Sequence, residues 1–318
     1  MQPTLIFSPS PHIHTARTVR GAMLHVIVAL VPALLCAAWY FGLPAISTAA
    51  VCVTACMATE WAVTRFLLRR PCSLGNLSAL LTGLLLALNL PSSLPWWTAV
   101  IGSVFAVGVA KMAFGGLGCN IFNPALAGRV FLLISFPALM TSWPLPGGAF
   151  SAAPDGATGA TVLSQLKFGA ADIPAVTDML TGHMGGSMGE TGAAAILLGL
   201  MYLLAVRVIS WHIPVAIIAT VAVFDALLGA PVAVNLLSGG LLLGAVFMAT
   251  DYVTSPMTHR AMLVYGVFIG VVTVIIRQWG AYPEGMSFAI LLGNAVTPLL
   301  NRWIAPRRFS PRRKEVAA

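Results

Sequence analysis

Charge is the scarcest property of this 318-residue chain: 8% of its residues are Asp, Glu, Lys or Arg, and only 9 are acidic. Hydrophobic residues make up 58% of the chain, and the mean hydropathy is +0.92. The surface of a water-soluble globular protein needs more charge than this, so that class is excluded. The composition predicts an integral membrane protein.

Paired cysteines and clustered histidines are lacking as well. The five cysteines, Cys36, Cys52, Cys56, Cys72 and Cys119, are scattered, and none forms a C-x-x-C pair. Neither a disulfide framework nor a metal site is therefore expected. Cys52 and Cys56 lie one helical turn apart, so a shared ligand is geometrically possible, but packing inside a membrane helix is the simpler interpretation.

The short alternating segments of a membrane β-barrel are also missing. The apolar runs instead have the length of about 20 residues that a helix needs to cross hydrocarbon. We therefore expect an all-α polytopic membrane protein with about ten transmembrane helices. The predicted spans are residues 21–43, 45–66, 76–94, 96–111, 124–140, 191–207, 211–229, 235–250, 261–278 and 285–303.

The basic residues follow these spans and form no patch with interleaved aromatic residues, so the net charge of +8 reflects membrane topology and not nucleic-acid binding. With both termini in the cytoplasm, nearly all Lys and Arg residues, Lys111 and Arg129 among them, are expected at the inner face. Only Lys167 and Arg277 remain outside. The acids expected at the outer face are Asp155, Asp172, Asp178, Glu190 and Glu284.

Five predicted spans precede the polar loop 141–190 and five follow it, so a duplication would give two inverted five-helix repeats. We expect a single transmembrane domain over residues 1–318, with the loop outside the cytoplasm. Its parts are a first repeat at 1–140, the loop, a second repeat at 191–304 and a basic cytoplasmic tail at 305–318.

Each predicted repeat contains a glycine pair followed by a polar segment with proline. Gly115-Gly116 leads to the segment 117–124, and Gly239-Gly240 leads to the segment 250–256. Helix-breaking residues are tolerated in a membrane where the freed backbone lines a cavity or meets other protein. Two broken helices around a shared polar interior are thus expected, and two ordinary loops are the alternative.

Intramembrane acids are few: Glu60, Asp225 and Asp251. Each is a candidate for an ion path, because a lone carboxylate in lipid is costly. For Glu60 the plainer alternative is a pair with Arg65. At the start of the sixth span, Ser187 and Glu190 are spaced as a capping box, and an anion at that helix terminus is the other interpretation.

The polar loop contains the string Asp155-Gly156-Ala157-Thr158-Gly159-Ala160-Thr161. Such small residues predict a turn that exposes the hydroxyl of Thr161. The string resembles the flavinylation motif Asp-Gly-x-Ser/Thr-Gly/Ser-Ala-Thr of the NqrB/RnfD family of membrane flavoproteins. The resemblance implies that Thr161 carries FMN through a phosphoester bond, and that Asp155, Thr158, Gly159 and Ala160 form the motif that a flavin transferase recognises.

Three further strings are similar to the same family: 115–126 with its Asn120-x-x-Asn123-Pro124 core, 185–191 and 249–256. About 20 residues precede the first span, which makes the chain most similar to the branch of D subunits of Rnf complexes. This resemblance implies a noncovalent riboflavin beside Asn120, Asn123 and Asp251. Without it, the asparagines would cap broken helices, and Asp251 would begin a cytoplasmic loop.

The function implied is that of a membrane flavoprotein subunit, not catalytic alone, that couples electron transfer of the ferredoxin/NAD type to translocation of Na⁺ or H⁺. Its partners would be the other Rnf subunits, the flavin transferase and membrane lipid, and it would lie in the bacterial inner membrane with the FMN loop on the periplasmic side. The alternatives are a urea-type or ammonium-type channel, because inverted five-helix repeats also build channels, and an assembly scaffold.

Overall fold

A computed structural model describes residues 18–70, 73–147, 158–159, 161–167, 174–280, 282 and 284–304. Asp155, Ala160 and the predicted tail 305–318 lie outside these residues. The described chain is helical apart from a two-residue pairing in which strand β1 (Trp143–Pro144) lies antiparallel to β2 (Thr158–Gly159).

Helices in the first half of the chain follow its apolar runs closely. Their caps explain several boundaries: Thr18 accepts the Gly21 N–H at 3.1 Å before the first helix, and Pro124 stands at the first turn of another. The elements are α1 (Val19–Phe41), α2 (Leu43–Ala62), η1 (Val63–Leu67), η2 (Leu74–Asn76), α3 (Ser78–Leu88), α4 (Trp96–Val104), η3 (Phe105–Val109), η4 (Met112–Phe114), α5 (Pro124–Ser135) and α6 (Pro137–Met140).

Two short helices follow in the predicted loop, and the second half of the chain is again helical. The loop helices are α7 (Val162–Lys167) and α8 (Val176–Thr181). The remaining elements are α9 (Ala193–Ala205), α10 (His212–Leu227), α11 (Val232–Leu237), α12 (Leu241–Leu243), η5 (Gly244–Met248), α13 (His259–Trp279) and α14 (Met286–Trp303).

A helical segment overlaps each of the ten predicted spans, so the expectation of a helical membrane protein is supported. Four described segments are long and apolar enough to cross a membrane: Val19–Phe41, Leu43–Leu67, Trp96–Phe114 and His259–Trp279. Several others are shorter apolar helices, for example Ser78–Leu88. Ten complete spans in two inverted repeats, and the domain division drawn from them, stay predictions.

The predicted span 235–250 is interrupted, as the expectation of a broken helix at the second glycine pair implies. Helix α11 ends at Leu237, and Gly239 and Gly240 have φ angles of +70° and +63° before α12 begins. These left-handed values suit glycine and interrupt the helix, as expected for the second glycine pair. Gly115 and Gly116 also have positive φ, so both expected breaks are present.

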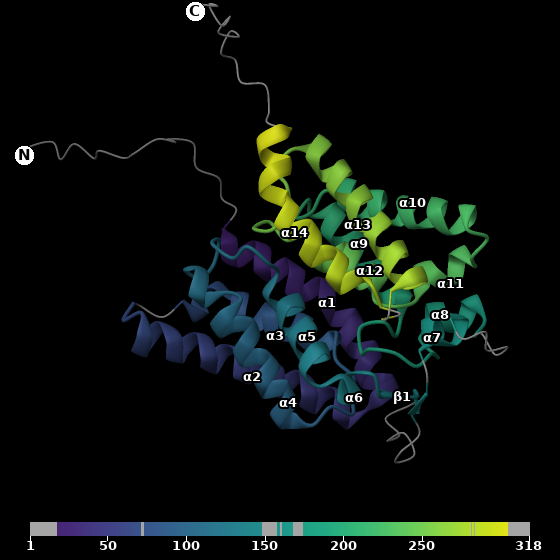
Figure 1. The fold of residues 1–318 in the computed structure, drawn as a ribbon. Helices are drawn as coiled ribbons and strands as arrows, with labels where there is room; N and C mark the ends of the chain where they lie inside the picture. Colours follow the sequence, from purple (N-terminus) through teal and green to yellow (C-terminus); the bar gives the residue numbers. More distant parts are fainter. Residues whose placement is uncertain are drawn as a thin grey trace, which may run out of the picture.

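The two halves lie side by side, with α1–α6 on one side and α9–α14 on the other (Figure 1). Similar pairs recur in both: α2 packs on α4 as α10 packs on α13, and α4 packs on α5 as α13 packs on α14. Across the junction, α1 packs on α9 and α5 on α14. The loop helices α7 and α8 lie at one end, next to α11 (Figure 1).

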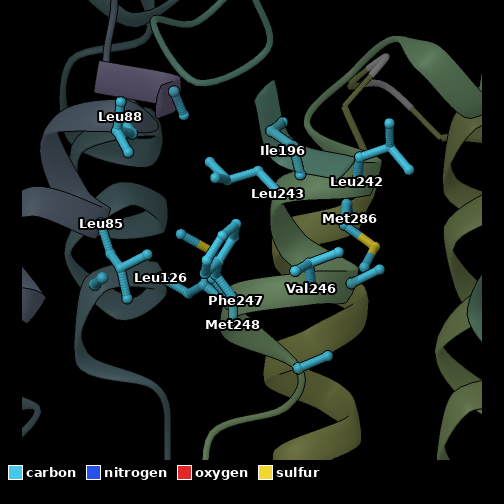
Figure 2. Packing of buried hydrophobic residues seen from close by; sticks show 14 of the residues in the cluster. Leu85, Leu88, Leu126, Ile196, Leu242, Leu243, Val246, Phe247, Met248 and Met286 are labelled. Carbon is cyan, nitrogen blue, oxygen red and sulfur yellow. The ribbon is translucent and has the colours of Figure 1, made fainter. Parts of the chain in front are cut away.

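The junction between the halves is a core of buried hydrophobic side chains. Phe247 and Met248 of η5 point toward Leu85 and Leu126 of the first half, and Met286 lies on the other side of the same short helix (Figure 2). Because lipid is as apolar as these residues, close packing and buried polar contacts, more than a hydrophobic driving force, hold the halves together.

Candidate functional site

A cavity lies between the two halves, and residues of both polar segments, 117–124 and 250–256, line it. The space between its walls, including the part that is open to solvent, is about 760 Å³. Asn120, Asn123 and Asp251, which are far apart in the sequence, all line it. The remaining wall is mostly apolar, from α1, α3, α9 and η5, and includes Leu85, Leu203 and Phe247.

The first glycine-rich break delivers the two asparagines. Gly118, like Gly115 and Gly116, has a positive φ, and the chain turns back to start α5 at Asn123. The Asn123 side-chain oxygen accepts the Ala125 N–H at 3.1 Å, so Asn123 caps α5 as well as lining the cavity. Asn120 donates to the Phe122 carbonyl at 3.0 Å. The capping and cavity-lining interpretations of Asn123 are therefore both correct.

Asp251 reaches the cavity from the second half, just after η5 ends. Thr254 donates to its Oδ2 at 3.3 Å. Burial raises the pKa of Asp251 above its ordinary value, while hydrogen bonds from the Val253 N–H and the Thr254 hydroxyl oppose this shift. The cavity thus combines amide groups and one carboxyl group in a largely apolar space.

A buried ion pair between Lys111 and Glu60 borders the same cavity. The sequence predicts Lys111 only as a basic residue at the inner face. Lys111 is 2% exposed and donates to Glu60 Oε2 at 2.6 Å and to Ser78 Oγ at 2.7 Å. Ser73 donates to the other Glu60 oxygen at 2.5 Å. The suggested Glu60–Arg65 pair is therefore wrong, because Lys111 neutralises Glu60, and Lys111 lines the cavity.

A second buried polar cluster lies toward the opposite end of the bundle. Arg129 forms an ion pair with Glu284 and donates to Asn89 Oδ1 at 3.0 Å and to Ser287 Oγ at 2.8 Å. Arg129 was expected at the inner face and Glu284 at the outer face, but Arg129 is buried in α5 and paired with Glu284, so the two expectations cannot both hold. This cluster was not predicted from the sequence, although a lone arginine within an apolar run signals a hidden acidic partner.

Met248 is contacted both by a residue that lines the cavity and by a residue of the cluster around Arg129. The Asn123 side-chain nitrogen donates to the Met248 carbonyl at 3.3 Å, and the Asn89 side-chain nitrogen lies 3.6 Å from its sulfur. Asn89 also accepts from Arg129. A series of polar contacts therefore runs through the junction of the halves, with this one residue in its middle.

Thr161 is placed differently from the sequence expectation. It is 3% exposed and precedes α7, where its hydroxyl lies 2.9 Å from Ser164 Oγ and accepts the Ser164 N–H at 3.3 Å. The prediction of an exposed hydroxyl is therefore wrong for this conformation. Thr158 and Gly159 form β2, while the predicted motif residues Asp155 and Ala160 lie outside the described residues.

Helix α7 connects Thr161 to the second helix break. Leu163 lies directly over Gly239, where an added methyl group would overlap the leucine side chain. Arg277 of α13 donates to the carbonyls of Asn235 at 2.6 Å and Ser238 at 3.0 Å, so its guanidinium satisfies the end of α11. The segment after Thr161 thus rests on the interrupted helix.

The capping box expected at the sixth span is not formed. The residue that precedes α9 is Gly192, which makes no side-chain cap, and Ser187 donates instead to Glu190 Oε1 at 2.9 Å. The third predicted acid, Asp225, is buried in α10, and its Oδ2 has no hydrogen-bond partner among the described residues.

For FMN, the residue type at position 161 is suitable, but its hydroxyl is engaged and must be released before a phosphoester can form. For riboflavin, the cavity offers apolar walls and the amides of Asn120 and Asn123. Of the two predicted cofactor positions, the cavity presents suitable polar and apolar groups directly, whereas Thr161 has first to be released from Ser164.

Known proteins of similar sequence share nearly the whole chain. The family model described as NQR2, RnfD, RnfE matches residues 6–310. The D subunit of a Na⁺-translocating ferredoxin:NAD⁺ oxidoreductase complex from Acetobacterium woodii is 46% identical over 96% of this chain and 95% of its own. The D subunit of an ion-translocating oxidoreductase complex from Stutzerimonas stutzeri is 42% identical over 90% and 91%.

The D subunit of a proton-translocating ferredoxin:NAD⁺ oxidoreductase complex from Clostridium ljungdahlii is 37% identical, over 96% of each chain. The relatives therefore include both Na⁺-translocating and proton-translocating complexes. The resemblance suggested by the four sequence strings is confirmed over nearly the full length: the chain belongs to the NQR2, RnfD, RnfE family.

Proposed function

We propose that this protein is the D subunit of an Rnf-type complex, a membrane flavoprotein that relays electrons and helps couple their flow to translocation of Na⁺ or H⁺. The observation that carries this proposal is the cavity at the junction, where Asn120 and Asn123 of one half meet Asp251 of the other. The repetition of helix pairs in the two halves supports an inverted duplication, the architecture of many transporters.

Within this proposal, the cavity holds a noncovalent riboflavin. Its apolar wall would cover the ring system, and the amides of Asn120 and Asn123 would supply directional hydrogen bonds. A bound flavin would supply one-electron chemistry, whereas the protein fixes its position and electrostatic surroundings. Lys111 presents an ammonium group on the same wall, held in place by its ion pair with Glu60 and its contact with Ser78.

The second part of the proposal is a covalent FMN on Thr161, outside the cytoplasm. The support for it is the motif and the family to which the chain belongs. Since the hydroxyl is bonded to Ser164, the turn before α7 has to open for a flavin transferase to reach it. Thr161 is then an anchor and not a catalytic group.

A fluorescent gel tests the covalent bond. The chain, co-expressed with a flavin transferase and separated under denaturing conditions, should fluoresce under ultraviolet light. Thr161→Ala should abolish the signal, whereas Thr177→Ala, which changes an exposed residue of α8 outside the motif, should retain it. Fluorescence that persists in Thr161→Ala would remove the flavin from this residue.

The noncovalent flavin is tested on the Thr161→Ala protein, which carries no covalent FMN. After purification in lipid and denaturation, it should release riboflavin in about a one-to-one ratio to the chain. Released flavin far below this ratio would rule out riboflavin in the cavity. The channel alternative predicts neither flavin, and the scaffold alternative predicts the same absence.

A further inference from the structure

Glu190 is a buried acid whose role neither the capping hypothesis nor the proposed flavin sites explain. It is 4% exposed and bonds to Ser187, which is three residues away. The ion pairs found among the described residues are Lys111–Glu60 and Arg129–Glu284, and neither includes Glu190. A carboxylate in such a place is costly, because burial without a paired charge disfavours ionisation.

The chain holds Glu190 in this position through the end of α3. The Met188 and Gly189 N–H groups donate to the carbonyls of Leu90 at 3.3 Å and Leu88 at 2.6 Å. These contacts fasten the 187–190 turn to the first half of the bundle, next to Asn89. Glu190 thereby lies beside the cluster around Arg129 without being bonded to that arginine.

Both arginines of this region are already engaged. Arg129 binds Glu284, Asn89 and Ser287, and Arg277 binds carbonyls at the end of α11. Two buried atoms, Oε1 of Glu284 and Nε of Arg277, nevertheless have no hydrogen-bond partner among the described residues. The cluster therefore contains unused hydrogen-bonding capacity beside an unpaired acid.

Gly240 lies where Glu190 and Arg129 approach each other. A methyl group at Gly240 would lie 3.4 Å from Glu190 Oε1 and 3.8 Å from Arg129 Nη1. Gly240 belongs to the break between α11 and α12, where its φ is +63°. Movement at this break would therefore change the separation of the acid from the arginine.

We propose that Glu190 is a proton-exchange site at the junction of the two halves. In one state its carboxyl group is protonated and bonded to Ser187; in the other it has released H⁺, and its carboxylate competes with Glu284 for Arg129. The exchange is balanced, because one O–H bond breaks and one proton leaves while no electron is transferred.

The electrostatic surroundings support such an exchange. Burial and the negative charge of Glu284 raise the pKa of Glu190 to about 8, although Arg129, the Ser187 hydroxyl and Arg277 act in the opposite direction. These charges come from the segment before α14, from α5 and from α13. The Glu190 carboxyl group therefore holds its proton to a higher pH than an ordinary glutamate does.

The position of the site links it to the proposed flavin anchor. Gly239, adjacent to Gly240, lies under Leu163, two residues beyond Thr161. A displacement of α7 would thus be transmitted to the break beside Glu190 and Arg129. This link to electron flow rests on the proposed function, whereas the proton site does not.

Infrared spectroscopy tests the site on the purified full-length chain in lipid, without partner subunits. A band of protonated carboxyl groups should disappear as the pH is raised through about 8. Glu190→Gln should lose this titrating band, while Asp178→Asn, a change of an exposed acid, should retain it. An unchanged titrating band in Glu190→Gln would overturn the proposal.

If Glu190→Gln does not fold, Ser187→Ala provides the second test. It keeps the carboxyl group but removes the hydroxyl that donates to it, so the band should move to higher frequency. A band that does not move would overturn the assignment. Thr161→Ala should leave the titration intact, so loss of the flavin and loss of the proton site are distinguishable outcomes.

Discussion

Ser164 contacts the Thr161 hydroxyl through two groups: its N–H donates to Thr161 Oγ1 at 3.3 Å, and its own Oγ lies 2.9 Å from the same oxygen. The residue proposed to be modified is thus held in the first turn of α7. Each of these hydrogen bonds contributes about 1 kcal/mol to closure of the turn. Ser164 therefore opposes attachment of a flavin to the folded chain.

Ser164→Ala should accelerate flavinylation of the folded chain. Removing the Ser164 hydroxyl eliminates its contacts with the hydroxyl and the carbonyl of Thr161, while the Ser164 and Gln165 N–H groups still bond Thr161. Loss of even one of these contacts, at about 1 kcal/mol, should increase the open population roughly fivefold. The measurement is the growth of in-gel fluorescence with time after addition of flavin transferase and its flavin donor. Thr177→Ala, which changes an exposed residue of α8, serves as the control and should match the wild type. Equal rates for all three proteins would show that the hydrogen bonds of Ser164 do not slow flavinylation of Thr161.

Arg129→Leu should destabilise the protein by about 3–5 kcal/mol, because it leaves Glu284 buried without its partner. Replacing both residues with leucine should recover much of this loss. Unfolding in detergent, followed by tryptophan fluorescence, gives the comparison, and Arg260→Leu at an exposed position is the control. Equal stability of Arg129→Leu and its control would exclude the buried pair.

Lys111 and Glu60 should be energetically coupled. Lys111→Met and Glu60→Met should each destabilise the chain, whereas the double variant should be more stable than the sum of the two losses predicts. We expect an interaction energy of about 0.5–3 kcal/mol from the double-mutant cycle. Additive losses would show that the pair makes no net contribution.

Asn123 combines a helix cap with a donor toward Met248, and two substitutions separate these functions. Asn123→Ala should cost about 0.5–2 kcal/mol in stability through the lost cap and should release the noncovalent flavin. Asn123→Ser should retain the cap but lack the amide, so it should be stable and flavin-free. Full flavin content in the serine variant would show that the amide does not bind it.

Glu190 should make the stability of the chain depend on pH. Its pKa is about 8 when folded, against 4.5 for the ordinary group, so the folded state binds the proton more tightly. Its contribution to stability is fully present below pH 4.5 and is lost as the pH rises toward 8. Thermal unfolding of wild type and Glu190→Gln across this range should show a decline in the wild type that is smaller in the variant. The same decline of stability with pH in both proteins would show that Glu190 does not cause the pH dependence.

The helices and both breaks were predictable because their causes are local. Apolar runs specify helices, and the Gly115-Gly116 and Gly239-Gly240 pairs adopt the positive φ angles that interrupt them. The meeting of Asn123 with Asp251 could be anticipated from the family resemblance, but not from spacing, since 128 residues separate them.

The buried charges could not be placed by the same reasoning. Topology rules assign Lys111 and Arg129 to the inner face because they count basic residues without their partners. In the structure, these residues meet acids that are distant in sequence, Glu60 and Glu284. The prediction for Thr161 failed for a similar reason at short range, because it ignored a partner. Ser164, three residues later, bonds the Thr161 hydroxyl, so Thr161 caps a helix and is not an exposed turn residue.

Met248 also links the two polar regions of the junction through different parts of one residue, its sulfur and its carbonyl. Helix α3 has 11 residues, about half of a full crossing, and the polar groups beyond its end and those of the cavity approach the same methionine from opposite sides. A change of the side chain at this position would therefore act directly on the contact with Asn89 and would leave the backbone contact with Asn123 in place.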